Sequence, residues 1–180
     1  MSLDEFKNID PTFNEAMFLT KVNNVFIKLF TAIMMDKLDE VNHFVGDEVF
    51  NYANNILSKV KDKGCRQMYD ELNVKDSRIV DVIVNEGVYQ LKVLLQSRYM
   101  DYIINLSNGN VISGDDSSRI EVNYNLVFTK KIGAKEANSI RRCPSCNAPL
   151  SVNTSGLCEY CGSTYNQEEY DWVLTKLEIC

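Results

Sequence analysis

Four cysteines near the end of the chain have the spacing of a metal site. Cys143 and Cys146 form one Cys-x-x-Cys pair, and Cys158 and Cys161 form a second pair after eleven further residues. In a zinc ribbon, each such pair forms a tight turn, the knuckle, whose two sulfurs point inward. The segment between the pairs is a hairpin that brings the two knuckles together. The spacing therefore predicts a tetrahedral zinc site with four sulfur ligands.

The residues around the cysteines fit this prediction. Asn147 and Gly162 each follow the second cysteine of a knuckle, where the chain often needs a positive φ that Gly and Asn tolerate best. Residues 153–156 (Asn-Thr-Ser-Gly) have the composition of the expected hairpin turn. Both observations favour two knuckles joined by a hairpin.

Three other roles for the cysteines fit the sequence less well than a zinc site or remain open beside it. A redox centre is usually a single Cys-x-x-Cys that opens a helix in a βαβ unit, and that context is missing. A disulfide framework is typical of small secreted domains rather than of a chain with a normal core. An iron–sulfur site has compatible spacing, so the choice between zinc and iron stays open at this point.

The predicted zinc is structural rather than catalytic. A catalytic zinc usually has three protein ligands and leaves a fourth position for water, whereas four thiolates fill the coordination shell. The single histidine, His43, lies about a hundred residues upstream, so no acid–base partner is evident near the cysteines. We expect the metal to replace the apolar core that a module of this size cannot build.

Composition indicates a globular protein and argues against two classes of partner. Hydrophobic residues make up 45% of the 180 positions and charged residues 24%. The net charge is −6, and basic residues cluster only at Lys130-Lys131 and Arg141-Arg142, so nucleic acid is not an expected partner. No run approaches the roughly 18 uninterrupted apolar residues that cross a bilayer. Membrane association would need a segment outside this chain.

The first third of the sequence predicts helices. Asp10 and Pro11 have the features of an N-cap and a first helical residue, and apolar residues then recur at helical spacing up to Met34. A short helix is expected over 36–44. A third helix is expected over 48–61, with Gly64 ending it.

After Gly64 the apolar period changes to two, which predicts strands over 72–85, 88–104, 111–113 and 119–131, with Asn108-Gly109 as a hairpin turn. Helices followed by a curved antiparallel sheet indicate an α+β domain over residues 10–132. Residues 133–142 are expected to be a linker, and 143–180 a zinc ribbon with a terminal strand.

Several segments resemble bacterial proteins that combine a Tim44-like domain with a C-terminal zinc ribbon. Besides the cysteine pairs, the segments that carry the resemblance are IDPTFNEAMFLTKV, MDKLDEVNHFVGDEVFNYA, SRYMDYIINLSNGNVISGD and DWVLTKLE. One departure is Asn147, where such ribbons more often have Gly. The resemblance implies a cone-like fold of the nuclear-transport-factor-2-like superfamily, whose helices and curved sheet enclose an apolar cavity.

The resemblance also implies a function in docking, because mitochondrial Tim44 uses its similar domain as a docking element at the inner membrane. We therefore expect a non-catalytic module that engages a polypeptide segment or a lipid at the cytosolic face of a membrane. Free thiols and a zinc site fit the reducing cytoplasm. Transferring the word translocase to this chain would be an analogy of fold alone. Nothing in the sequence indicates an oligomeric state.

Five aromatic residues are candidates for lining the cavity: Phe26, Phe30, Tyr99, Tyr124 and Phe128. They either surround a lipid tail or peptide, or simply fill the core, and we favour the second interpretation. The alternative function is a small-molecule-binding protein or an isomerase- or hydratase-type enzyme that uses an Asp base with a Tyr donor. Asp101 and Asp81 are the carboxylates available for this role, but we expect them to be surface residues.

Four further residues have simpler interpretations. His43 is expected to be a partly exposed residue at a helix end, and Asp115-Asp116 a solvated turn that lacks the acidic repeats of a calcium loop. Cys65 is expected to be partly buried, and Cys180 to be free.

Overall fold

The computed structural model of the protein describes residues 1–85, 87–132, 142–143, 145–149, 158–163 and 171–180. The helices are α1 (Leu3–Ile9), α2 (Glu15–Met35), the 3-10 helix η1 (Leu38–Val41) and α3 (Asp47–Lys61). The strands are β1 (Cys65–Asn85), β2 (Val88–Asn105), β3 (Val111–Gly114), β4 (Ile120–Lys131) and β5 (Val173–Ile179). This arrangement confirms the α+β class: the helices pack on one antiparallel sheet of five strands.

The N-terminal helices differ from the sequence prediction. A separate helix, α1, precedes the expected one, and its first turn is closed by a capping box between Ser2 and Glu5. Asp10 does not cap α2. Its carboxylate instead accepts a hydrogen bond from the Thr12 N–H (3.1 Å) in the turn between the two helices. Helix α2 begins after Asn14, whose side chain accepts a hydrogen bond from the Met17 N–H (3.0 Å). Asp10 and Asn14 are both residue types that cap helices, and Asn14 is the one that caps α2.

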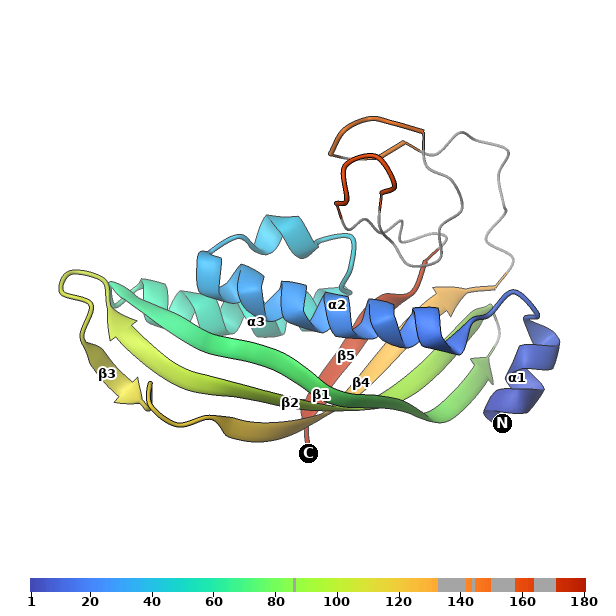
Figure 1. Ribbon diagram of the computed structural model, residues 1–180, viewed down its shortest axis with the longest axis horizontal. Coiled ribbons are helices and arrows are strands. Elements are labelled where there is room, and N and C mark those ends of the chain that lie inside the picture. Colours follow the sequence, from blue (N-terminus) through green and yellow to red (C-terminus); the bar gives the residue numbers. More distant parts are fainter. Residues whose placement is uncertain (86, 133–141, 144, 150–157, 164–170) are drawn as a thin grey trace.

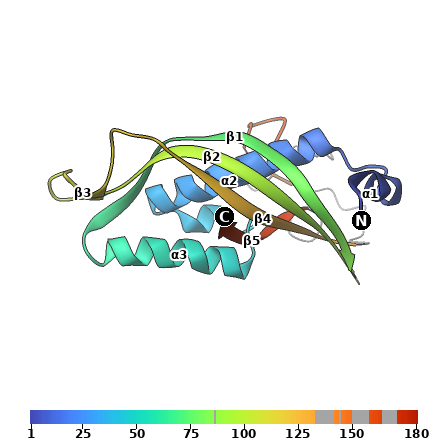
Figure 2. The same ribbon diagram turned by 90° about the horizontal axis from the view of Figure 1, so that it is seen from below.

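Helix α2 is the central core helix. Its length and composition would also allow it to cross a membrane, but half of the apolar window is buried inside the protein. Figures 1 and 2 show α2 and α3 lying on the same face of the curved sheet. The buried residues of α2 occupy most of its circumference and leave a narrow exposed stripe that includes Ile27, Thr31 and Met35.

The sheet has the order β1-β2-β4-β5, and β3 pairs with the end of β2. Strand β1 starts at Cys65, directly after the positive-φ residue Gly64, and is therefore longer than predicted. It pairs antiparallel with β2 along its whole length, with three register shifts. Such irregularities bend a strand and increase its twist, which fits the strong curvature visible in Figure 2.

Strand β5 belongs to the main sheet. The sequence predicted this terminal strand as part of the zinc ribbon, but β5 pairs antiparallel with β4, from Tyr124↔Ile179 to Thr129↔Val173. The edge of β5 that faces away from β4 is also hydrogen-bonded. The N–H of Leu174 donates to the carbonyl of Phe44 (2.9 Å), and the N–H of Gly46 donates to the carbonyl of Leu174 (2.8 Å). The cysteine-bearing segment is therefore an excursion of the chain between two neighbouring strands.

A buried ion pair holds the start of this last strand against α2. The Lys21 ammonium lies 3.0 Å from the Asp171 carboxylate, and the Lys21 side chain is only 4% exposed. Burial lowers the pKa of Lys21, and the charge of Asp171 acts in the opposite direction. Sequence reasoning missed this pair, although Lys21 lies directly before Val22 on the apolar face of the helix.

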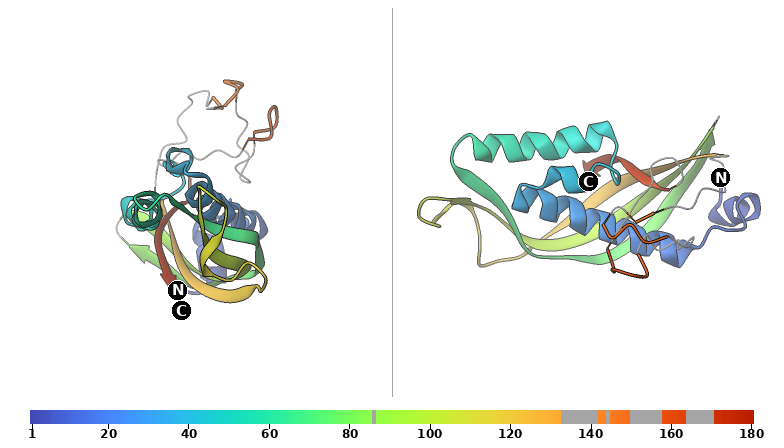
Figure 3. Two further views of the ribbon diagram at one scale, coloured as in Figure 1. Left: turned by 90° about the vertical axis from the view of Figure 1, so that its left-hand side faces the viewer. Right: turned by 90° about the horizontal axis from the view of Figure 1, so that it is seen from above.

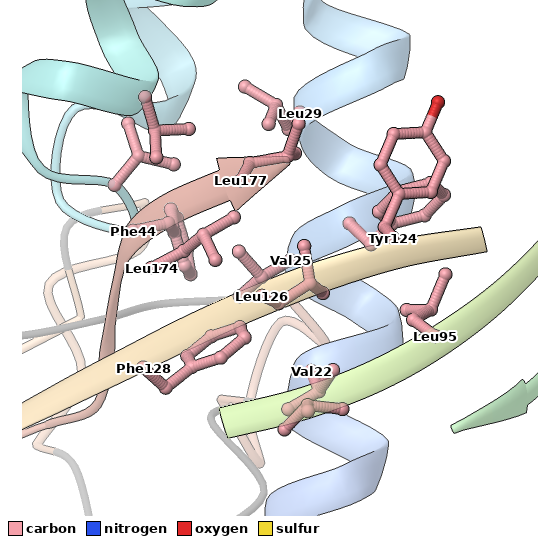
Figure 4. Packing of buried hydrophobic residues seen from close by; sticks show 14 of the residues in the cluster. Val22, Val25, Leu29, Phe44, Leu95, Tyr124, Leu126, Phe128, Leu174 and Leu177 are labelled. Carbon is pink, nitrogen blue, oxygen red and sulfur yellow. The ribbon is translucent and has the colours of Figure 1, made fainter. Parts of the chain in front are cut away.

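The core lies between the helices and the sheet. Figure 4 shows side chains from α2, β2, β4 and β5 pointing toward one another, among them Val22, Leu29, Leu95, Leu126 and Leu177. Leu29, Leu95 and Leu126 are fully buried. Because the core takes side chains from both ends of the chain, β5 is a structural part of the domain that the helices build.

Candidate functional site

The two cysteine pairs form knuckles with the same backbone geometry. The N–H of Cys143 donates to the carbonyl of Ala148 (2.9 Å), and the N–H of Asn147 donates to the carbonyl of Cys143 (2.8 Å). The second knuckle repeats this pattern, with Cys158 bonded to Ser163 and Gly162 (2.9 Å each). Asn147 (φ 58°) and Gly162 (φ 70°) have the positive φ that their positions predicted.

The four sulfur atoms lie within 4.8 Å of one another. Two separations join the two knuckles: 3.7 Å from the sulfur of Cys143 to that of Cys161, and 3.7 Å from the sulfur of Cys146 to that of Cys158. A tetrahedral zinc with Zn–S bonds of about 2.3 Å would place its sulfurs about 3.8 Å apart. A disulfide would need about 2.05 Å. The arrangement therefore fits four ligands of one metal ion, and all four cysteines are free thiols in the structure.

Electrostatics around the sulfurs favour a bound cation. The Ser163 hydroxyl lies 3.2 Å from the Cys161 sulfur and lowers the pKa of Cys161 to about 6. Backbone donors, chiefly the N–H of Cys146, also lower the pKa of Cys143. For Cys146, a hydrogen bond from the Ala148 backbone lowers the pKa, but burial and the neighbouring thiols outweigh it and raise the pKa to about 12. Four thiolates at these distances repel one another, and a divalent cation removes that repulsion.

The knuckles lie apart from the main core. Figures 1 and 3 place them over α2, on the side of this helix that faces away from the sheet. Cys143 and Cys158 are each 2% exposed and form a small buried cluster of their own, whereas Cys146 and Cys161 are exposed. The described part of the module therefore offers little apolar area to stabilise it.

The structure brings together four of the five predicted cavity aromatics. The ring of Phe30 lies 4.5 Å from that of Phe26, 5.6 Å from that of Tyr124 and 6.1 Å from that of Tyr99. The hydroxyl groups of Tyr99 and Tyr124 are hydrogen-bonded at 2.7 Å, and burial raises the pKa of both residues. Each of these four side chains is at most 3% exposed.

The fifth candidate, Phe128, lies in a different group of rings. Its ring centroid lies 5.6 Å from that of Phe18, and the ring centroid of Phe18 lies 5.2 Å from that of Trp172, directly before the last strand. Sequence reasoning did not separate the two groups, because strand alternation places Tyr124 and Phe128 on the same sheet face without showing how far apart they lie.

Asp101 lies closer to tyrosines than its spacing suggested. After burial, its charge is among the causes that raise the pKa of Tyr52, Tyr69 and Tyr99. Its carboxylate accepts a hydrogen bond of 2.6 Å from the side-chain amide of Gln67, which is 8% exposed. The other candidate base, Asp81, forms an exposed ion pair with Lys92 (2.9 Å), and this pair lowers the pKa of Asp81.

The remaining candidates occupy simple positions. His43 is exposed in the turn after η1, and the Asp115 carboxylate accepts a hydrogen bond from the Ser117 N–H (2.8 Å) in an exposed turn. Cys65 is 6% exposed at the start of β1, and Cys180 is exposed.

Three comparisons place the chain among known proteins. A family model described as "Tim44-like domain" matches residues 1–138. No curated protein matches the sequence. Among solved structures, the crystal structure of the intermembrane space region of the chloroplast protein ARC6 matches with 8% sequence identity and a TM-score of 0.40. That match covers 99% of this chain and 96% of the ARC6 chain. Because the family model spans about three quarters of its residues, the chain belongs to the Tim44-like domain family.

Proposed function

We propose that the chain is a non-catalytic docking module that engages a polypeptide segment or a lipid at the cytosolic face of a membrane. In this proposal, Cys143, Cys146, Cys158 and Cys161 hold one structural zinc ion. The observation that carries the docking proposal is the mutual contact of the interior rings. Phe26, Phe30, Tyr99 and Tyr124 contact one another rather than lining open space.

The donor set supports a structural role for the metal. Four cysteine sulfurs within 4.8 Å of one another would complete the shell of a bound zinc ion and leave no position for a reacting water. When bound, zinc would supply the cross-link between the two knuckles. The protein also favours the thiolate form, because hydrogen bonding to the side chain and backbone of Ser163 lowers the pKa of Cys161. Family membership supports docking as well, since Tim44-like domains are not known as catalysts.

A second candidate function is small-molecule binding at the end of the sheet that carries Asp101. The observation in its favour is that the charge of Asp101, after burial, is among the causes that raise the pKa of Tyr52, Tyr69 and Tyr99. A base and a hydroxyl donor within reach of one ligand are what an isomerase or hydratase needs. The hydrogen bond from Gln67 occupies part of the carboxylate and reduces its capacity to accept a substrate proton.

Native mass spectrometry of the purified chain under gentle conditions tests these proposals together. A mass of one chain plus one zinc ion supports the structural site and a filled interior. One iron ion in place of zinc contradicts the metal assignment. An additional small molecule that is released on denaturation favours the second candidate, and its identity would name the ligand class. Turnover that is lost on changing Asp101 to Asn would overturn the non-catalytic proposal.

A further inference from the structure

The segment 106–120 forms an exposed arm at the end of the molecule beyond α2 and α3 (Figures 1 and 2). It contains β3, and every one of its residues is exposed. The arm is nevertheless fixed to the sheet. Gly114 (φ 82°) approaches β2 so closely that a Cβ atom there would lie 2.2 Å from the carbonyl oxygen of Asp101. The N–H of Asp115 donates to that same oxygen (3.1 Å).

Large apolar side chains are concentrated on this arm. Leu106 (51%), Val111 (38%), Ile112 (55%) and Ile120 (43%) are all substantially exposed. A single exposed aliphatic residue is ordinary on a protein surface. Here four of them lie within fifteen residues of one exposed segment, and apolar side chains gathered in this way mark sites of interaction.

The arm also has a free strand edge. Strand β3 pairs with β2 along one side, from Tyr102↔Gly114 to Ile104↔Val111, and no described strand pairs with its other side. The last listed pair of β4 with β5 is Tyr124↔Ile179, and the N–H of Cys180 donates to the carbonyl of Asn123 (2.9 Å), so within the described residues β5 lies beside β4 and leaves the edge of β3 unpaired. An unpaired edge of this kind accepts an added strand through backbone hydrogen bonds.

The charge beside this edge is negative. A hollow of about 400 Å³ is lined by Gln67, Asp101, Ile103, Ser113, Asp115 and Ile120, among others. Within the described part of the chain, neither Asp101 nor Asp115 forms an ion pair with a basic side chain, whereas Lys75 and Arg119 are paired with Glu121 and Glu71. Basic side chains on a partner would complement these carboxylates.

We propose that the arm is the docking site for an extended polypeptide segment in which apolar and basic residues alternate. The partner adds a strand to the free edge of β3. Its basic side chains face Asp101 and Asp115, and its apolar side chains contact residues such as Ile112. This inference rests on the proposed docking function and names the site and the partner chemistry.

The test uses the full zinc-bound chain and three labelled eight-residue peptides with blocked ends, followed by fluorescence anisotropy. One peptide alternates Val and Lys, a second alternates Val and Glu, and the third is the Val/Lys peptide with alternate backbone amides methylated. The proposal expects only the first to bind well, and its affinity should fall as salt is raised, because exposed charges are screened. Equal binding of the Val/Glu peptide overturns the charge argument, and equal binding of the methylated peptide overturns strand addition.

Two variants locate the site, with a matched control. Ile112→Gln removes an exposed apolar side chain from the arm and should weaken Val/Lys binding about threefold to tenfold. Asp115→Asn combined with Asp116→Asn should weaken binding about threefold or more and flatten the salt dependence. Val80→Gln changes a similarly exposed residue (52%) on β1, away from the arm, and should leave binding unchanged.

The outcomes separate this inference from the docking function on which it rests. Val/Lys binding that survives both arm changes would leave docking intact and refute the site. Self-association that is lost in Ile112→Gln would show that a second copy of the chain occupies the edge, which also refutes the inference. If none of the peptides binds while vesicles of anionic lipid do, the polypeptide partner is wrong and the lipid form of the docking proposal remains. Absence of binding to both would refute the docking function itself.

Discussion

Two regions of the molecule bring distant residues together by different chemistry. Between the helices and the sheet, rings such as Phe26 and Phe30 exclude water, and their burial stabilises the fold without any ligand. In the cysteine module only Cys143 and Cys158 form a buried cluster among the described residues. The comparison teaches that the sheet domain has a large apolar core, whereas the described part of the module has little apolar area and, in the function proposed above, would take its folding free energy from a metal ion.

The largest expected effect concerns the metal. Cys143→Ser should abolish stoichiometric zinc binding, since it removes one of four ligands and with it much of a binding free energy of about 10–16 kcal/mol. Native mass spectrometry checks the metal, and hydrogen exchange should show faster exchange in residues 142–163 while β2 stays protected. Cys180→Ser is the matched control and should retain zinc. A Cys143→Ser chain that still holds one zinc ion would refute the ligand assignment.

A substitution in the core should lower the stability of the fold but leave zinc binding unchanged. Phe26→Ala should lower the free energy of unfolding by about 3–5 kcal/mol, because it leaves a cavity among the rings of Phe30 and Tyr124. Urea denaturation measures the loss, and the variant should keep its zinc. The control is Ile27→Ala, the next residue on the same helix, which is 36% exposed and should cost about 1 kcal/mol or less. Loss of zinc in Phe26→Ala would show that the two regions are not independent.

The buried ion pair tests the junction of the two regions. Asp171→Asn leaves the Lys21 charge buried without its carboxylate and should lower the free energy of unfolding by about 2–4 kcal/mol at pH 7. Thermal or urea denaturation measures this difference. Glu15→Gln removes the partner of an exposed lysine, Lys7, at a similar 2.9 Å distance and should cost far less. Equal losses of unfolding free energy in both variants would show that burial does not increase the contribution of the Lys21–Asp171 pair to stability.

The stability of Asp171→Asn should also depend on pH. Burial lowers the pKa of Lys21 in the folded protein from its ordinary value of 10.5, so the unfolded chain binds more protons between the two pKa values. Stability from this residue therefore rises with pH across that interval. Removing Asp171 lowers the folded pKa of Lys21 further, so the deficit of Asp171→Asn should shrink as the pH rises from the folded pKa of the variant to that of the unchanged protein, both of which lie below 10.5. A deficit that stays constant or grows would contradict this account.

The smallest expected effect distinguishes the two knuckles. Asn147 has a positive φ at the position where the second knuckle has Gly162. Asn147→Gly should change zinc affinity by less than about threefold, because both residues tolerate this backbone conformation. Asn147→Ala should weaken zinc binding by about fivefold or more, since the left-handed conformation costs Ala roughly 1–2 kcal/mol. Competition with a chromophoric chelator measures both, and equal affinities for Gly and Ala would show that φ at this position is unimportant.

The fold was largely predictable because its signals are local. The change from helical to alternating spacing at Gly64 and the Asn108-Gly109 turn predicted elements that the structure contains. Helix α1 was missed because its seven residues have little periodicity, although Phe6 is fully buried. The partner of β5 was missed because alternation shows which side chains share a face but not which strand lies beside them.

The candidate sites were predictable to different degrees. The spacing of the cysteines selected Cys143, Cys146, Cys158 and Cys161, and the structure brings these four sulfurs within 4.8 Å of one another. The closeness of Asp101 to several tyrosines was not predictable, since it depends on the register between β1 and β2 and on where α3 packs. The pair of Lys21 and Asp171 joins residues 150 positions apart, and the pairing of β5 with β4 brings them together.

The position of β5 has a consequence for how fragments of this protein should be designed. The stretch that matches the family model stops at residue 138, before this strand. A fragment that stops there would lack Leu174 and Leu177, which cover Leu126 and Phe128 in the intact sheet. It would also expose the backbone edge of β4, and such an edge promotes aggregation. The cysteine excursion should therefore be replaced by a short polar linker between residues 132 and 171, rather than removed by truncation.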